Sequence, residues 1–229
     1  MKTKFSIVIP CFNEENTVSG VVTNLCMDFP DILIVVVDDG STDKSVINLK
    51  KIIYPNFNLI ELGKNYGKGF AMRSGLDHIK SKSEIVIFTD ADSEVNLKDL
   101  NKVISLYENN PEMVSIFGSR FINISLKTIF KMGIDRYIVN RLLTTIGNIR
   151  YGSKLTDIET AVKSFKTALI DDLKLNSNGF DIEPEIVRSL CNNNIEIHEV
   201  SVGYDPRSIK EGKKISFKDG IVTLRELFK

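Results

Sequence analysis

The sequence predicts an α/β fold in which a mainly parallel central sheet is flanked by helices. Short runs of β-branched and aromatic residues, typical of buried strands, lie at 5–9, 35–37 and 85–88. Segments with the apolar spacing of helices separate these runs. Because alternating strands and helices form parallel strands joined by right-handed crossovers, we expect one sheet built in this way.

The first predicted strand, 5–9, leaves through Pro10 into a polar loop. The helix predicted over 16–27 follows, because its apolar residues recur at helical spacing and Asn16 is a suitable cap. Glu14 in the loop has two interpretations. It either contacts a ligand at the strand end or stabilises the dipole of the following helix.

The second predicted strand, 35–37, ends in Asp38, Asp39 and a turn that Asp38 is expected to support. Farther along, a glycine-rich turn at 65–69 leads into another helical pattern. A turn of this kind can place backbone N–H groups near a phosphate. Lys68 is therefore predicted either to contact phosphate or to be a solvated lysine of the first helical turn.

The third predicted strand, 85–88, is followed directly by Asp90 and Asp92. Side chains one residue apart at a strand end can project together, and two close carboxylates repel one another unless a cation lies between them. Mg²⁺ typically binds one or two carboxylates together with substrate phosphates. Because ligands of parallel sheets bind beyond the carboxyl ends of the strands, we expect these polar strand ends to converge on one pocket. The alternative is a polar strand end that caps the next helix.

Residues 120–154 combine large apolar residues with seven basic residues and one acidic residue, Asp135. The basic residues are Arg120, Lys127, Lys131, Arg136, Arg141, Arg150 and Lys154. Segments of this composition can lie on anionic membrane surfaces. The alternative is a helix that packs on the core and whose basic face is solvated.

The composition suits one enzyme domain over residues 1–229. Hydrophobic residues make up 42% of the chain and charged residues 26%, which is ordinary for a globular protein. Basic and acidic residues number 30 each, so the overall charge does not favour nucleic acid as a partner. Three scattered cysteines favour free thiols. Since no apolar run reaches the roughly 18–20 residues of a membrane span and no signal peptide is visible, we expect a cytoplasmic location.

Several motifs resemble the inverting nucleotide-sugar glycosyltransferases of family 2, which have the GT-A (Rossmann-like) fold. They are Ile9-Pro10-x-x-Asn13-Glu14, Val37-Asp38-Asp39-Gly40-Ser41, Gly67-Lys68-Gly69 and Asp90-Ala91-Asp92. Two further features resemble the dolichyl-phosphate mannosyltransferase and polyprenyl-phosphate glycosyltransferase branch. They are Gly118-Ser119-Arg120 and the pair Arg207 and Lys213. The resemblance implies a nucleotide-sugar half over 1–118 and an acceptor half with amphipathic helices over 119–229.

The resemblance also implies roles for individual residues. Nucleotide-sugar contacts are expected at Pro10, Phe12, Glu14, Val37, Asp39, Lys68, Asp90, Ala91, Arg207 and Lys213. Ligands for Mg²⁺ or Mn²⁺ are expected at Asp90, Asp92 and Glu94, where Glu94 replaces the glutamine usual in the mannosyltransferases. Acceptor-phosphate contacts are expected at Ser119, Arg120 and Arg136, with Arg207 and Lys213 binding either donor or acceptor phosphate. The catalytic residues are expected to be Asp92, Arg120 and Asp157.

The implied reaction is metal-dependent, inverting transfer of a hexose from a nucleoside diphosphate sugar to a polyprenyl or dolichyl phosphate. The donor would be of the UDP-glucose or GDP-mannose type, and the enzyme would lie on the cytoplasmic membrane face, with a separate membrane protein as a possible partner. Since a phosphate acceptor is already ionised, Asp157 is predicted to orient basic groups. One alternative is a soluble enzyme that uses Asp157 as general base on a saccharide hydroxyl. The other is a non-catalytic nucleotide-sugar-binding subunit.

A last segment, 179–185, resembles the family segment that opens a helix beneath the site. Here Glu185 is predicted to face inward, whereas Asp181 and Glu183 are predicted to be structural caps.

Overall fold

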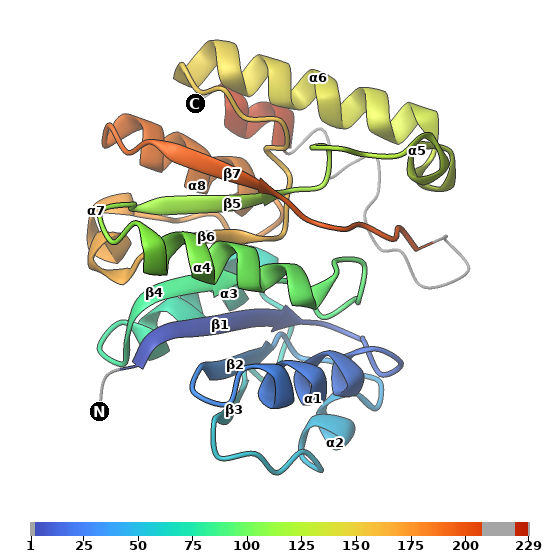
Figure 1. The fold of residues 1–229 in the computed structure, drawn as a ribbon. Helices are drawn as coiled ribbons and strands as arrows, with labels where there is room; N and C mark the ends of the chain where they lie inside the picture. Colours follow the sequence, from blue (N-terminus) through green and yellow to red (C-terminus); the bar gives the residue numbers. More distant parts are fainter. Residues whose placement is uncertain (1–2, 208–222, 229) are drawn as a thin grey trace.

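The computed structural model describes residues 3–207 and 223–228 (Figure 1). Within these residues the chain forms a seven-stranded sheet in the order β3-β2-β1-β4-β6-β5-β7. The strands are β1 (Thr3–Cys11), β2 (Leu33–Asp38), β3 (Phe57–Glu61), β4 (Ser83–Phe88), β5 (Ser115–Ser119), β6 (Lys163–Lys166) and β7 (Ile197–Ser201). The predicted α/β class and the three predicted strands are confirmed.

Strand direction places the ends of most strands at one edge of the sheet. β1 runs parallel to β2 and β4, β2 runs parallel to β3, and β7 runs parallel to β5. β6 is antiparallel to both of its neighbours, β4 and β5. β5 therefore points the same way as β4, and the carboxyl ends of β1, β2, β4, β5 and β7 share one edge. The prediction of a mainly parallel sheet is correct.

Helices cover both faces of the sheet (Figure 1). They are α1 (Val18–Asp28), α2 (Ser45–Leu49), α3 (Lys68–Ile79), α4 (Leu100–Asn109), α5 (Leu126–Met132), α6 (Ile134–Tyr151), α7 (Ile170–Leu173) and α8 (Ile182–Asn192). Two 3₁₀ turns, η1 (Leu97–Asp99) and η2 (Thr167–Leu169), precede α4 and α7. The helix predicted over 16–27 begins two residues late, because Thr17 rather than Asn16 occupies its N-cap position. None of the helices in the described ranges has the length and hydrophobicity needed to cross a bilayer.

The alternation of side chains along β1 fills a core on each face. Ile7 and Ile9 belong to a cluster that includes residues of α1 and α4. Val8 belongs to a second cluster, which includes residues of α3 and α8. Because both faces are buried, the strands consist of nearly continuous apolar runs.

Close packing fixes the position of α3 and therefore of Lys68 at its start. A Cβ atom at Gly75 would lie 2.4 Å from Val8 Cγ1, so only glycine allows α3 to approach β1 this closely. The preceding residue, Gly67, has a φ of 103°, a backbone conformation that a side chain would strain. Gly75 thus lets α3 pack closely on β1, and Gly67 provides the turn from which α3 starts at Lys68.

Candidate active site

Three carboxylates follow β4 at the carboxyl edge of the sheet. Asp90 Oδ1 lies 2.8 Å from the Lys68 ammonium, and Asp92 Oδ1 accepts a hydrogen bond of 3.0 Å from the Glu94 backbone N–H. Ser93, which lies between Asp92 and Glu94, has a left-handed φ of 62° that turns the chain sharply there. Burial, followed by the negative charges of Asp90 and Glu94, raises the pKa of Asp92 to about 7. The turn thus concentrates negative charge in a partly desolvated place.

The guanidinium of Arg207 lies among these acids. Its Nη1 is 2.9 Å from Glu14 Oε2, and its Nη2 is 3.3 Å from Asp92 Oδ2. Its Nε is 3.6 Å from Glu94 Oε1. The segment after β7 is held in this place by the loop after β4, since the Asp205 N–H donates to the Glu94 carbonyl oxygen at 2.8 Å. Burial alone would lower the pKa of Arg207, but the surrounding carboxylates outweigh burial and raise it.

Lys68 links Asp90 to a buried pair farther inside. Its ammonium lies 2.8 Å from Glu183 Oε1, and Lys163 Nζ lies 2.6 Å from the other oxygen, Glu183 Oε2. Lys68 is therefore not the solvated lysine that one interpretation of the sequence allowed. The prediction that Glu183 is a structural cap was wrong, because this side chain faces the site and contacts two lysines. Glu185 instead accepts hydrogen bonds from the backbone of residues 176 and 177.

The predicted metal ligands do not converge into a ready cage. In the two described ranges of the chain, no three acidic, histidine or cysteine side chains are grouped so that they could hold a metal ion. The reason is that Asp90 pairs with Lys68, whereas Asp92 and Glu94 pair with Arg207. The donor chemistry nevertheless fits Mg²⁺ or Mn²⁺, because hard divalent cations prefer carboxylate oxygens.

The charge balance of this edge also fits a divalent cation. Among the residues that the structure describes, the ion pairs at this edge join five carboxylates to three cations. These groups together carry a charge of −2 when all are ionised. The carboxylates are those of Glu14, Asp90, Asp92, Glu94 and Glu183, and the cations are Lys68, Lys163 and Arg207.

The carboxyl end of β2 organises the neighbouring turns. Asp38 Oδ2 accepts hydrogen bonds from the backbone N–H groups of Gly40 and Ser41, which confirms the predicted support of this turn. Asp39 accepts hydrogen bonds of 2.7 and 2.8 Å from the N–H groups of Tyr66 and Gly67. Burial raises the pKa of Asp39, although these two amides act in the opposite direction. Asp39 thus ties β2 to the glycine-rich turn that precedes α3.

The loop after β1 is anchored on the loop after β2. Asn13 has a left-handed φ of 52°, and its backbone N–H donates to Ser41 Oγ at 2.8 Å. Pro10 is among the last residues of β1 that pair with β2, and Phe12 follows the strand; both are partly exposed at this edge, which leaves them accessible to a ligand.

Two predicted donor contacts lie inside the protein. The side chains of Val37 and Ala91 are buried in the two core clusters. Donor contacts at these two positions stay a prediction, and with both side chains buried they would be made by backbone atoms.

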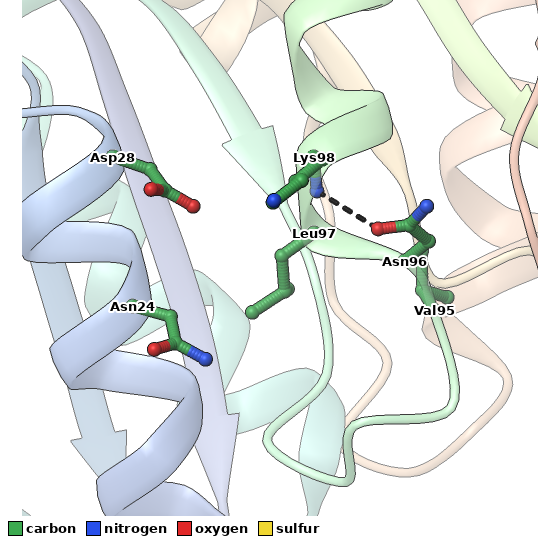
Figure 2. Close-up of a pocket in the computed structure, with 6 residues that line it drawn as sticks. All are labelled: Asn24, Asp28, Val95, Asn96, Leu97 and Lys98. Carbon is green, nitrogen blue, oxygen red and sulfur yellow. Dashed lines mark hydrogen bonds between the residues drawn. The ribbon is translucent and has the colours of Figure 1, made fainter.

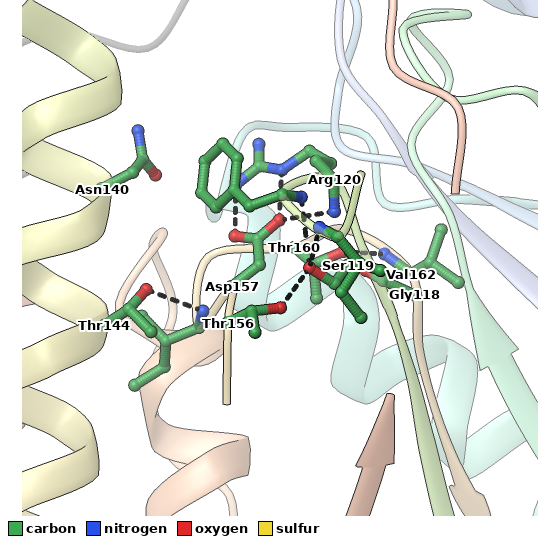
Figure 3. A network of polar contacts seen from close by, with 12 residues as sticks. Gly118, Ser119, Arg120, Asn140, Thr144, Thr156, Asp157, Thr160 and Val162 are labelled. Atoms are coloured by element: carbon green, nitrogen blue, oxygen red, sulfur yellow. Dashed lines mark hydrogen bonds and ion pairs between the residues drawn. The ribbon is translucent and has the colours of Figure 1, made fainter. Parts of the chain in front are cut away.

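Arg120 and Asp157 form a buried ion pair after β5 (Figure 3). Arg120 Nε lies 2.6 Å from Asp157 Oδ2, and Nη2 lies 2.7 Å from Oδ1. The backbone N–H of Arg120 also donates to Oδ2, at 3.1 Å. Burial would lower the pKa of Arg120, but the negative charge of Asp157 outweighs burial and raises this pKa. Because Asp157 is fully buried and both its oxygens accept from Arg120, the geometry suits orientation of Arg120 rather than removal of a proton.

The other two predicted acceptor residues differ in their placement. Ser119 is fully buried, and its hydroxyl bonds to Thr156 and accepts hydrogen bonds from backbone N–H groups of the following turn; its contact with acceptor phosphate stays a prediction. Arg136 lies on the face of α6 that it shares with Asn140 and with buried Leu143, by helical spacing. Figure 3 shows Asn140 on the side of α6 that faces Asp157. The predicted residue Lys213 lies outside the described residues.

Sequence reasoning did not anticipate three groups beside the site. Lys163 is fully buried in β6, and no local signal marks it, because β6 has a lysine at each end and Lys166 is partly exposed. Burial raises the pKa of the Glu159 carboxyl to about 7, and its Oε1 atom has no hydrogen-bond partner. The ring of Tyr204 lies 5.3 Å from the Arg120 guanidinium, in cation–π contact.

α5 and α6 expose a row of large apolar side chains, which we call the apolar stripe. Its members are 50–81% exposed. They are Leu126, Phe130, Ile134, Ile138, Leu142 and Ile149. Within α6 the spacing of these residues places them opposite Leu143 and Gly147, which pack inward. A ring contact of 5.5 Å between Tyr137 and Phe121 joins α6 to the turn that carries Arg120.

A hollow of about 430 Å³ between α1 and the loop before α4 lies apart from these groups (Figure 2). It is lined by Asn24, Asp28, Val95, Asn96, Leu97 and Lys98. None of the predicted site residues lines it, so the candidate site is defined by the converging polar groups rather than by this hollow.

The sheet with its helices has the predicted GT-A architecture, and sequence comparison defines the family. The profile described as "Glycosyl transferase family 2" matches residues 6–173. The chain therefore belongs to glycosyl transferase family 2.

Two named relatives are similar to this chain in sequence. The chain is 28% identical over 179 residues to dodecaprenyl-phosphate galacturonate synthase of Rhizobium johnstonii, covering 75% of this chain and 50% of that protein. It is 26% identical over 224 residues to dolichyl-phosphate beta-glucosyltransferase of Saccharomyces cerevisiae, covering 87% and 66%. The chain thus spans between half and two thirds of the length of these two relatives.

A solved structure supports the fold. Glucosyl-3-phosphoglycerate synthase from Mycobacterium tuberculosis in complex with UDP has a TM-score of 0.76 at 16% identity, covering 99% of this chain and 79% of that one. The same enzyme was also crystallised with Mn²⁺, UDP-glucose and phosphoglyceric acid, and that structure has a TM-score of 0.69 at 16% identity, covering 99% and 80%. At this level of identity, the likeness establishes the shared architecture.

Proposed function

We propose that the chain transfers a hexose from a nucleoside diphosphate sugar of the UDP-glucose or GDP-mannose type to a polyprenyl or dolichyl phosphate. Transfer would invert the anomeric carbon and require Mg²⁺ or Mn²⁺. The observation that carries the choice of a lipid phosphate as acceptor is the apolar stripe on α5 and α6, because α6 packs beside the turn that carries Arg120. Relatives named for transfer to dodecaprenyl and dolichyl phosphates support the same acceptor class.

The donor would bind in residues 1–118, over the carboxyl ends of β1, β2 and β4. Asp39 and the turn it holds would receive the nucleoside, and Asp90, Asp92 and Glu94 would hold the divalent cation. A divalent cation bound there would neutralise charge that develops on the departing nucleoside diphosphate. We assign Arg207 to the donor diphosphate, because its guanidinium already lies among these acids.

The acceptor would bind in residues 119–229. Arg120, oriented by Asp157, and Arg136 would hold the acceptor phosphate through their forked donors. One phosphate oxygen would attack the anomeric carbon from the face opposite the diphosphate. The new C–O bond would form as the bond to the diphosphate breaks, and no base is required because the phosphate is already ionised.

The apolar stripe would place the enzyme on the cytoplasmic face of a membrane, with a separate membrane protein as a possible partner. Exposed basic residues on the same helices, such as Lys127 and Arg150, would attract anionic lipids. A polyprenyl phosphate has its phosphate at the membrane surface, so docking by α5 and α6 would bring it close to Arg120.

A screen of radiolabelled nucleotide sugars with extracted polyprenyl phosphate in anionic vesicles tests the proposal. We expect label in the lipid fraction, loss of transfer with EDTA, and vesicle binding that weakens as salt rises. Transfer to a water-soluble saccharide, with none to lipid and no vesicle binding, would favour the saccharide alternative. That alternative would also require Asp157 to separate from Arg120 before it could act as a base.

A matched pair of variants isolates the membrane contact. Replacing Phe130 and Ile138 together by Ser is expected to weaken vesicle binding and lipid transfer while nucleotide affinity stays unchanged. Ile53→Ser is the control, because Ile53 is 91% exposed and lies outside the stripe. Equal vesicle binding by both variants would contradict docking through α5 and α6. Arg136→Ala is expected to reduce use of the lipid acceptor without loss of nucleotide affinity.

A further inference from the structure

The ammonium of Lys68 is shared between two carboxylates that come from different parts of the chain. Asp90 follows β4, and Glu183 lies in the first turn of α8; each has an oxygen 2.8 Å from Lys68 Nζ. The side chain of Lys68 is only 13% exposed, so water does little to replace either partner. Lys68 is therefore held by one group of the predicted metal site and by one group outside it.

A second lysine compensates Glu183 from the other side. Lys163 Nζ lies 2.6 Å from Glu183 Oε2 and also donates to the Thr160 carbonyl oxygen. The four groups alternate in charge, in the order Asp90, Lys68, Glu183, Lys163. Burial would raise the pKa of Glu183, but Lys163 and Lys68 outweigh burial and lower it. The two lysines thus favour the ionised form of Glu183, which can hold Lys68 as a counter-charge.

We propose that Glu183 is a positioning residue: it retains Lys68 when Asp90 turns toward a divalent cation, and so makes Asp90 available as a ligand. The inference rests on the proposed metal-dependent transfer and adds a residue that the family motifs did not assign here. Without Glu183, Lys68 would have Asp90 as its sole partner among these groups. The lysine would then compete with the cation for the same carboxylate.

Binding of Mn²⁺ to the intact chain, measured from the free Mn²⁺ signal in electron paramagnetic resonance, tests the inference with and without UDP. Glu183→Gln is expected to raise the Kd for Mn²⁺ by roughly 10–100-fold, the usual effect of losing a group that supports a metal ligand. Adding Lys68→Met to this variant removes the competitor, so the double variant is expected to recover at least the wild-type Mn²⁺ affinity. A purely structural role for Glu183 predicts no such recovery.

Glu183→Gln leaves Lys163 buried without a counter-charge, and the variant could fail to fold. The double variant Glu183→Gln/Lys163→Met removes both charges of that pair and keeps the remaining balance. It is expected to show the same loss of Mn²⁺ affinity. Glu226→Gln is the matched control, because Glu226 is another buried carboxylate paired with an arginine, away from the predicted ligands, and Mn²⁺ binding should not change.

The possible outcomes separate this inference from the proposed function. If the wild-type chain binds no Mn²⁺ either alone or with UDP, the metal dependence fails and this inference fails with it. If the wild-type chain binds Mn²⁺ and the Glu183 variants bind it equally well, only the positioning role is overturned. Weaker binding that Lys68→Met does not restore also overturns it. Weaker binding that Lys68→Met restores supports it.

Discussion

Replacing Asp157 by Asn distinguishes a carboxylate that orients Arg120 from one that removes a proton. Asp157 is fully buried and accepts three hydrogen bonds from Arg120, two of them from the guanidinium. Asn retains the shape but removes the charge, and it leaves a guanidinium whose side chain is 12% exposed without its counter-ion. Breaking a buried pair in this way costs about 3–5 kcal/mol of unfolding free energy. For a chain of this length, the Tm should fall by about 10 °C.

The kinetic consequence depends on which role is correct. If Asp157 orients Arg120, misplacement of the guanidinium by about 1 Å should lower kcat by about 100-fold at every pH. The pH profiles of the variant and the wild type would then be parallel. If Asp157 were a general base, the wild-type rate would rise with pH below the pKa of the base, and the variant would lose that rise.

The assay is initial-rate transfer to polyprenyl phosphate over a range of pH, with Tm measured on the same samples. Glu226→Gln is the control for stability, since Glu226 is buried and lies 2.7 Å from Arg188. It should lower the Tm without lowering kcat. If Asp157→Asn lowers the Tm but leaves kcat unchanged, as expected for Glu226→Gln, the orienting role is refuted. If the variant instead loses the rise in rate with pH, Asp157 acts as a general base.

Three further predictions follow from single side chains. Asp92→Asn should lower kcat by more than about 100-fold with an unchanged circular dichroism spectrum, and wild-type activity that survives EDTA would contradict the metal assignment. Asp39→Ala releases the Tyr66 amide, so calorimetry should show nucleotide affinity reduced by about tenfold or more; unchanged affinity would count against the donor role. Burial raises the pKa of Glu159 from 4.5 to about 7, so the folded chain binds this proton more tightly and the unfolding free energy falls as pH rises through that window. Glu159→Gln should therefore be more stable than wild type at pH 8, by at most about 3 kcal/mol, but not at pH 4, and chemical denaturation that shows parallel pH curves would exclude this cause.

Local patterns were sufficient to predict the three strands β1, β2 and β4 and the edge at which their ends meet. The apolar runs of β1, β2 and β4 each end in polar residues, and parallel pairing brings those ends together whatever the details of packing. The same patterns could not reveal the burial of Ser119, because it results from contacts with Thr156 and with the turn after β5.

Partners distant in the chain account for most of what the sequence did not show. Arg207 contacts Glu14 across 193 residues, and Lys163 contacts Glu183 across 20. No spacing rule links such residues, because their approach follows from the order of strands in the sheet and from the path of the segment after β7. β6 has a lysine at each end, and only the finished fold shows that Lys163 is the one that is buried with a counter-charge.

The ion pairs at the carboxyl edge have a consequence for ligand binding. Asp90 and Asp92 are each already paired with a cation of the chain, Lys68 and Arg207. A metal that binds both acids draws them from these partners, but Lys68 keeps Glu183, and Arg207 keeps Glu14 and Glu94. The metal cancels the charge of −2 that the cluster carries, so the place where the donor diphosphate would lie no longer repels it. The metal therefore favours binding of the nucleotide sugar, and by reciprocity the nucleotide sugar favours binding of the metal.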